Sequence, residues 1–214
     1  MPAAGRCPRR VVVVDKPDAT QAQIRVAGVA IPRRSDDWFP SQVANAVLGG
    51  GFTSRLVEEI RVNRGLSYGV RSRFAAGRAS GVFSLTSFTK NESAGELVSV
   101  AFAEMARFAE EGPTAEEVSR AAAWLSGLFP LGLETHDQWA DRIGDAWVLG
   151  YGLEDVRDQA DRVRSVTREQ ARDVARRHLP LADGVVLAVG PARVLGPQLS
   201  RFGAVEVWPV RRVM

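Results

Sequence analysis

The sequence is poor in the residues that metal and disulfide sites need. Cys7 is the only cysteine, so no internal disulfide can form, and His136 and His178 are the only histidines. The two histidines lie far apart in the sequence, and neither belongs to an H-x-x-E-H or H-E-x-x-H pattern. We expect no zinc site in this chain, because zinc needs several His, Cys or carboxylate ligands brought together. No nucleophile elbow surrounds any serine, which leaves Ser-His-Asp catalysis without support.

Long apolar runs are also missing. No run of about 18 apolar residues exists, so we expect no membrane span. The four valines at 11–14 are too few for the core of a signal peptide. The hydrophobic content of 45% and the charged content of 25% are typical of a globular domain. We therefore expect a soluble protein. Its compartment is left open, with the bacterial cytoplasm or periplasm as the expectation.

Lysine is nearly absent, since Lys16 and Lys90 are the only two and the other basic residues are arginines. One interpretation of so many arginines is a nucleic-acid surface. The arginines are, however, spread along the whole chain and interspersed with acidic residues, and the net charge is only +3. A nucleic-acid footprint needs a local patch. We favour a compositional bias toward arginine and expect no nucleic-acid partner.

The pattern of apolar residues predicts six strands, several of them bounded by glycine or proline turns. A turn at 16–18 separates the first two, and glycines connect an antiparallel pair in the middle of the chain. The predicted strands are residues 10–14, 22–31, 67–76, 81–89, 184–190 and 204–210.

Helical periodicity fills the segments between these strands. Capping boxes predict helix starts at Ser93, Thr114 and Thr167, each followed three residues later by Glu or Gln. Further helices are expected over about 38–47, 53–64, 134–149 and 153–164. This order predicts an α+β fold: a two-layer sandwich with a mixed, mostly antiparallel sheet and helices packed on one face. We expect residues 1–214 to form a single domain.

The most informative segment is LGGGFTSRLVEEIRVNRGLSYGV, residues 48–70. It joins a triple glycine, a short helix carrying Arg61, a second glycine at Gly65, and Tyr68. Arginine offers a rigid fork of donors, and tyrosine offers one phenolic donor. If both face one groove, two donors aimed at a peptide carbonyl can stabilise an oxyanion. Spacing alone favours the alternative, in which Arg61 is solvated and Tyr68 is half-buried packing.

The same segment closely resembles the C-terminal-half signature of the pitrilysin and mitochondrial-processing-peptidase family of zinc peptidases. The likeness covers about residues 10–195, including VVVVDKPDATQAQIRV, LFPLGLET, VTREQARDVARRHL and GVVLAVGP. The parts that match the signature are Leu48 to Gly51, Ser54-Arg55-Leu56, Arg61, Arg64-Gly65-Leu66 and Tyr68.

The resemblance implies a two-half enzyme that closes like a clam shell around an unstructured peptide. The catalytic half carries zinc on H-x-x-E-H, and this chain lacks that motif. The chain is then the zinc-free half, inactive alone, whose Arg61 and Tyr68 hold the substrate backbone near the scissile bond. The expected partner is a zinc-bearing half-domain or subunit.

Two alternatives stay open. Relatives with degraded sites act as inert scaffold or assembly subunits, and this chain could be one of them. A homodimer is a further possible partner arrangement. A basic nucleic-acid-binding domain is the remote alternative, which a salt-dependent interaction with DNA would revive.

Overall fold

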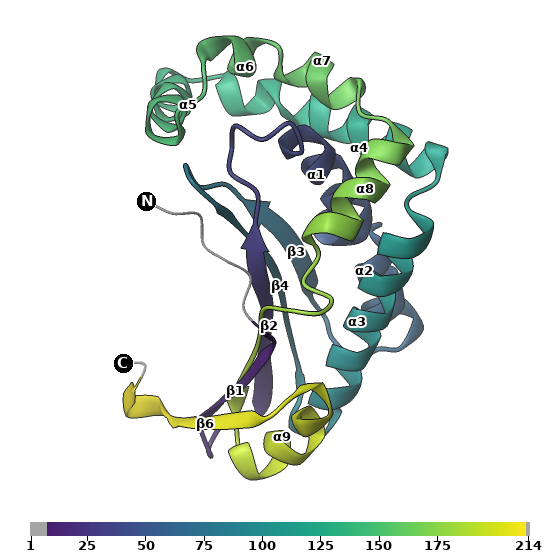
Figure 1. The fold of residues 1–214 in the computed structure, drawn as a ribbon, viewed down its shortest axis with the longest axis vertical. Coiled ribbons are helices and arrows are strands. Elements are labelled where there is room, and N and C mark those ends of the chain that lie inside the picture. Colours follow the sequence, from purple (N-terminus) through teal and green to yellow (C-terminus); the bar gives the residue numbers. More distant parts are fainter. Residues whose placement is uncertain (1–7, 213–214) are drawn as a thin grey trace.

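The computed structural model describes residues 8–212 and builds them around one six-stranded mixed sheet (Figure 1). Cys7 lies outside the described residues. The sheet order is β3-β4-β2-β5-β1-β6. The strands are β1 (Arg10–Asp15), β2 (Gln21–Ala30), β3 (Val70–Ala75), β4 (Gly81–Lys90), β5 (Val185–Gly190) and β6 (Val205–Pro209). All six predicted strands are present, with bounds that differ by up to three residues.

Both strand directions occur in the sheet. Strand β2 is antiparallel to β4 and to β5, and β3 is antiparallel to β4. Strand β1 is parallel to both β5 and β6, so the predicted mixed, mostly antiparallel sheet is confirmed. The first two strands of the sequence are not neighbours, because β5 lies between them. Val11 to Val14 are at most 4% exposed, so β1 is buried on both faces, which explains its unbroken apolar run.

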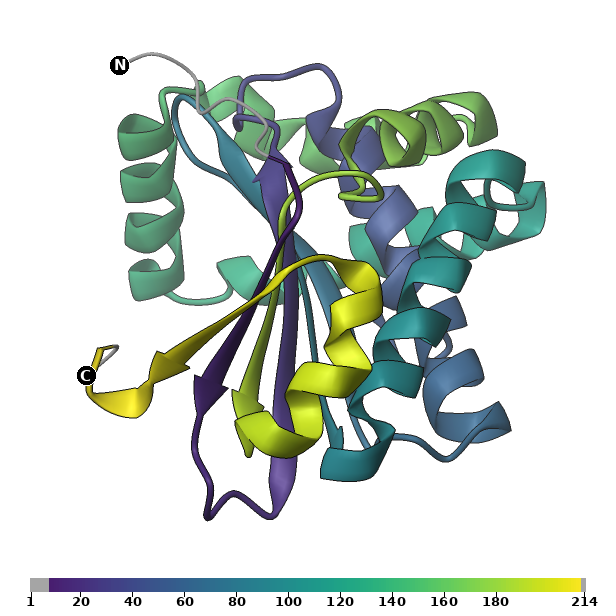
Figure 2. The same cartoon turned by 60° about the horizontal axis from the view of Figure 1, so that its bottom comes forward.

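The helices form a layer on one face of the sheet, with one exception (Figures 1 and 2). Helix α5 lies on the opposite side of the sheet from α3 and α9 (Figure 2). No helix within residues 8–212 is long and apolar enough to cross a membrane. The α-helices are α1 (Trp38–Asn45), α2 (Arg55–Val57), α3 (Ala94–Glu111), α4 (Ala115–Leu128), α5 (His136–Leu149), α6 (Leu153–Arg157), α7 (Gln159–Arg164), α8 (Arg168–His178) and α9 (Ala192–Leu199).

One cluster of buried side chains joins the two layers. Strand β2 contributes Ile24, strand β4 contributes Phe83 and Leu85, and α3 contributes Met105 and Phe108, all fully buried. Buried residues occur at every second position of the strands and about every three to four positions of α3, as expected when one face of each element is buried. The core therefore has the two-layer arrangement that the sequence pattern predicts.

The predicted helix starts are confirmed at Thr114 and Thr167, where both bonds of the capping box are present. The helix start predicted at Ser93 is also confirmed, since α3 begins at Ala94, but the capping box predicted there is wrong, because the Ser93 side chain forms no capping bond. A 3-10 turn at Asn91–Ser93 leads directly into α3, so Ser93 has φ −99° and ψ 2° instead of the extended conformation of an N-cap. A box that the prediction missed opens α5 at Thr135, with Gln138.

Candidate functional site

The triple glycine allows the end of α1 to pack closely against β3. A π-helical turn (Ala46–Gly50) follows α1, and the glycines end it, since Gly49 already has non-helical angles, φ −162° and ψ 15°, and Gly51 is extended. Asn45 and Ser72 bind one another: the Asn45 amide donates to the Ser72 carbonyl at 3.0 Å, and the Ser72 hydroxyl donates to Asn45 Oδ1 at 2.8 Å. A Cβ at Gly49 would overlap Ser72 Oγ and lie 2.8 Å from Leu56 Cδ1. Gly49 is therefore required for this contact. At Gly51 the nearest atom would be 4.0 Å away.

A helical run made of α2 and a π-helical segment (Glu58–Asn63) carries Arg61 in its last turn. Leu56 and Ile60 are fully buried on one side of the run, and Arg61 is exposed on the other. Gly65 ends the run with φ 61°, and the Leu66 N–H donates to the Ile60 carbonyl at 2.9 Å. This bond across a left-handed glycine spans one residue more than the six-to-one bond of a Schellman ending, as expected after a π-helical segment.

Arg55, the arginine of the Ser-Arg-Leu motif, fastens this run to α4. Its guanidinium donates to both carboxylate oxygens of Glu117, at 2.8 and 2.7 Å, and to the Gly112 carbonyl at 3.2 Å. Glu117 also accepts from the Thr114 N–H at 2.7 Å, as part of the capping box of α4. The Arg55 hydrogen bonds are the main reason that the pKa of Glu117 falls to about 2. Arg55 therefore has a structural role.

The loop that presents Tyr68 is held by hydroxyl groups of β4. Thr89 Oγ1 donates to the Leu66 carbonyl at 2.6 Å, and Ser87 Oγ donates to the Gly69 carbonyl at 2.9 Å. Ser67, which is buried, bonds to the backbone of Gly69. Tyr68 projects from this framework with 84% of its surface exposed. The expectation of a half-buried packing tyrosine is thus wrong.

An exposed aromatic residue adjoins Arg61. The guanidinium carbon of Arg61 lies 5.8 Å from the centroid of the Phe52 ring, within the range of a cation–π contact. Phe52 is 84% exposed and directly follows the glycines. Phe52 was not among the predicted site residues, although an aromatic residue directly after a glycine run is a signal that the sequence contains. Phe52, Arg61 and Tyr68 all project from the 48–70 segment.

Arg61 and Tyr68 do not line either of two surface cavities of about 330 and 460 Å³. No hydrogen bond joins the two side chains within residues 8–212. The structure places both side chains in solvent on one segment, and the groove that we expected to lie between them stays a prediction.

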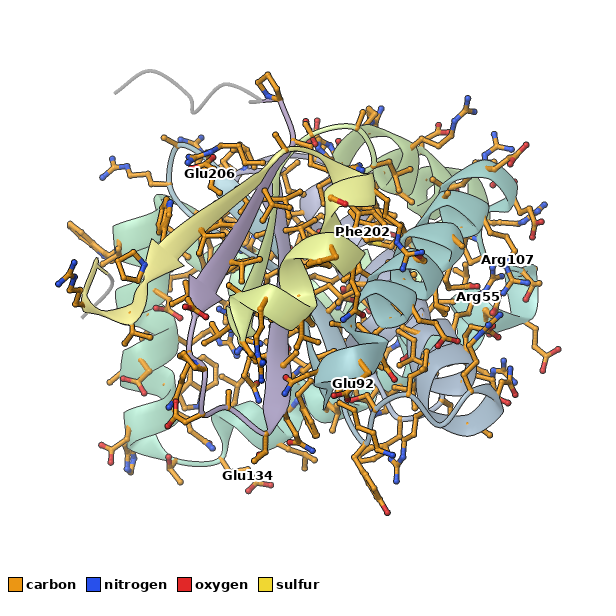
Figure 3. The ribbon with its side chains drawn as sticks, turned by 90° about the horizontal axis from the view of Figure 1, so that it is seen from below. Arg55, Glu92, Arg107, Glu134, Phe202 and Glu206 are labelled. Carbon is orange, nitrogen blue, oxygen red and sulfur yellow. The ribbon has the colours of Figure 1, made fainter. Side chains whose placement is uncertain are left out.

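The smaller cavity lies behind the π-helical segment that carries Arg61 and contains a buried carboxylate. Its lining includes Glu59, Arg64 and Glu104. Glu104 is 4% exposed, and burial is the main cause that raises its pKa. Glu104 Oε2 accepts from Arg107 at 2.5 Å, while Oε1 has no partner within the described part of the chain. Figure 3 shows Arg55 and Arg107 on the helical side of the molecule.

The donor set of the described chain does not fit zinc. No group of three or more His, Cys, Asp or Glu side chains that could hold a metal occurs in residues 8–212. His178 Nε2 instead lies 2.8 Å from Asp37 Oδ2, where it ties the end of α8 to the start of α1. His136 is exposed at the first position of α5.

Comparison with known proteins gives this geometry a family. Residues 4–125 match the model of the Peptidase M16 inactive domain. The chain belongs to this family. The resemblance found in the sequence is thus confirmed, and this M16 inactive domain has the fold of a solved relative. The crystal structure of a peptidase M16 inactive domain from Pseudomonas fluorescens superposes with a TM-score of 0.81 at 25% identity, over 88% of this chain and 45% of that one.

Two curated relatives extend the comparison. An uncharacterized zinc protease of Mycobacterium leprae is 32% identical over 192 residues, which is 89% of this chain and 41% of that protein. A non-peptidase homolog of Helicobacter pylori is 31% identical over 151 residues, 69% of this chain and 34% of that protein. The chain therefore spans less than half of the length of the relatives it matches.

Proposed function

We propose that this M16 inactive domain, residues 1–214 as a single domain, is the zinc-free half of a metallopeptidase. A partner half with H-x-x-E-H holds the zinc, which supplies an activated water for attack on a peptide carbonyl. The observation that carries the proposal is that Arg61 and Tyr68 are both exposed on the same segment. Both are exposed on one segment whose backbone is fixed by buried anchors and by hydroxyls of β4.

Each of the two side chains has a distinct role in this proposal. Arg61 donates to a carbonyl of the substrate backbone, and Tyr68 donates its phenolic hydrogen toward the oxyanion that develops at the scissile carbonyl. Donors on a rigid segment need little reorganisation as charge develops, which is where their catalytic value lies. Exposure in this chain supports a site that the partner half completes around an unstructured peptide.

An inert scaffold is the second candidate. It is favoured by the Helicobacter pylori relative, which is described as a non-peptidase homolog. Under this alternative the chain still pairs with a second half, or with its own copy, but the assembly cleaves no peptide. The presence of Arg61 and Tyr68 at the signature positions favours the peptidase proposal.

The test uses the protein assembled with its zinc-bearing half and an unstructured fluorogenic peptide. We expect Tyr68→Phe to lower kcat/KM by about 10²–10³, the usual cost of one oxyanion donor, and Arg61→Ala to lower it comparably. Arg120→Ala is the control, because it removes an exposed guanidinium from α4 at no proposed site. Rates within twofold of the wild type for both Arg61→Ala and Tyr68→Phe would overturn the assigned roles. An assembly without peptidase activity would favour the scaffold.

A further inference from the structure

Three arginines that are remote in the sequence share the open face of the sheet. Arg71 of β3 and Arg25 of β2 both lie opposite Thr86 of β4 in the antiparallel register. Directly opposite residues point to the same face, and Arg73 follows Arg71 by two positions on that face. Arg25, Arg71 and Arg73 are all exposed. We call these three residues the arginine row.

The arginine row has no carboxylate partner in residues 8–212. Several other arginines do bind a carboxylate, as Arg55 binds Glu117. The residues around the row on this face carry no negative charge: Lys90 of β4 is basic, and the others are uncharged, namely Gln21, Gln23, Ala27 and Val29 of β2, Val82, Ser84, Thr86 and Phe88 of β4, and Ala75 of β3.

The paired residues that run across the sheet from Arg25 lead through Leu187 and Val12 to Glu206 of β6, which is the first acidic residue among them. It lies three strands beyond Arg25 and is bound by Arg10 at 2.7 Å. Three strand spacings are about 14 Å, which exceeds the screening length at physiological salt. Helix α5 lies on this side of the sheet (Figure 2), but its carboxylates form no ion pair with the row. The row is therefore a group of three exposed arginines that form no ion pair within the described residues.

The arginine row is continuous with the segment that presents Tyr68. Tyr68 precedes Arg71 by three residues, and Gly69 leads directly into β3. The ring of Phe88, on the open face of β4, lies 3.4 Å from the position that a Cβ on Gly69 would take. Phe88 and the loop backbone thus connect the exposed tyrosine to the open face.

We propose that the arginine row binds an acidic stretch of the peptide substrate and gives this site a preference for negatively charged peptides. The proposal rests on the proposed function, because it takes the peptide held by Arg61 and Tyr68 as the ligand. In an extended peptide, alternate side chains lie about 6.6–6.8 Å apart on one face, the same repeat that separates Arg71 from Arg73. Asp or Glu at alternate positions therefore match the row, and arginine suits them through paired N–H donors.

The peptide lies over the open face in this arrangement and does not extend the sheet at its edge. Asn45 of α1 already donates to the carbonyl of Ser72 in the edge strand β3, at 3.0 Å. That bond occupies a backbone group that an added strand would need. Recognition is therefore by side-chain charge.

The experiment compares two fluorogenic peptides with the same scissile region in the assembled enzyme, one with Asp at three alternate flanking positions and one with Asn there. The triple variant Arg25→Gln, Arg71→Gln, Arg73→Gln should raise KM for the Asp peptide by about two- to five-fold per arginine and leave the Asn peptide unchanged. Arg78→Gln, an exposed arginine beyond β3, is the matched control. Added salt should reduce the preference of the wild type for the Asp peptide.

Binding of the labelled Asp peptide, followed by fluorescence anisotropy in the assembled protein, separates this inference from the proposed function. Loss of binding in the triple variant supports the row even if Arg61→Ala and Tyr68→Phe leave the rate unchanged. The role of the arginine row alone is overturned if the folded triple variant keeps the wild-type ratio of KM for the Asp and Asn peptides while Arg61→Ala and Tyr68→Phe both lower the rate. Two other outcomes also overturn the proposal for the row. One is a triple variant whose two halves associate more weakly but whose ratio of KM for the two peptides is unchanged. The other is a wild-type protein that binds single-stranded DNA more tightly than the Asp peptide.

Discussion

The ion pair between Arg55 and Glu117 gives the sharpest stability prediction. The side chains are 17% and 19% exposed, and the pKa of Glu117 falls from 4.5 to about 2. A lowering of this size corresponds to about 3 kcal/mol of stability at pH 7, at 1.36 kcal/mol per pKa unit. Glu117→Gln removes the charge but keeps a residue that can complete the capping box with Thr114. We expect it to lower the free energy of unfolding by about 2–3 kcal/mol at pH 7.

The pH dependence of this loss follows from the direction of the pKa shift. A carboxylate with a lowered pKa in the folded state stabilises the fold above its unfolded pKa, and the contribution disappears as the pH falls toward the folded pKa. The advantage of the wild type over Glu117→Gln should therefore shrink to about 1.5 kcal/mol at pH 3 and vanish below pH 2.

Urea unfolding of both proteins at pH 7 and pH 3 measures this difference. Glu116→Gln is the control, because the neighbouring Glu116–Arg120 pair is 79% and 70% exposed and should contribute within about 0.5 kcal/mol. A loss below about 1 kcal/mol at pH 7 for Glu117→Gln, or a loss that does not change with pH, would refute the reasoning.

Three further predictions test the framework around the site. Gly49→Ala should cost about 1–3 kcal/mol because its Cβ meets Leu56 and Ser72, whereas Gly51→Ala should cost less; equal losses in urea unfolding would contradict this. Thr167→Ala should cost about 1 kcal/mol through the lost cap, and Ser93→Ala much less, as thermal unfolding will show. Glu104→Gln should gain stability relative to the wild type as the pH rises from 4 to 8. Burial raises the pKa of Glu104, so its contribution is full at low pH and is lost as the pH rises through that raised pKa; a constant difference would contradict it.

Local patterns in the sequence predicted much of this fold, because they reflect interactions between residues that are close in the sequence. The valines of β1 and the alternation in β4 identify strands, and the capping boxes at Thr114 and Thr167 identify helix starts through bonds that span three residues. The capping box at Ser93 was predicted wrongly for the same reason, although the helix does start there. A capping pair in the sequence does not reveal that the preceding residues already form a 3-10 turn.

Long-range pairing could not be predicted in this way. Alternation shows which side of a strand is buried but not which strand lies beside it, so the position of β5 between β1 and β2 is visible only in the structure. The arginine row depends on the same information. Arg25 and Arg71 are remote in the sequence, and the register of β4 brings them to one face. Exposure of Tyr68 likewise depends on the anchors Ser87 and Thr89, which come from another strand.

The central claim is that this M16 inactive domain supplies half of a peptidase site and needs a zinc-bearing half to act. The most direct measurement compares cleavage of an unstructured peptide by this chain, by an H-x-x-E-H half from the same organism, and by their equimolar mixture. We predict no cleavage by this chain alone and rapid cleavage by the mixture, which Tyr68→Phe abolishes almost completely. Cleavage by the zinc half alone at the rate of the mixture would contradict the claim.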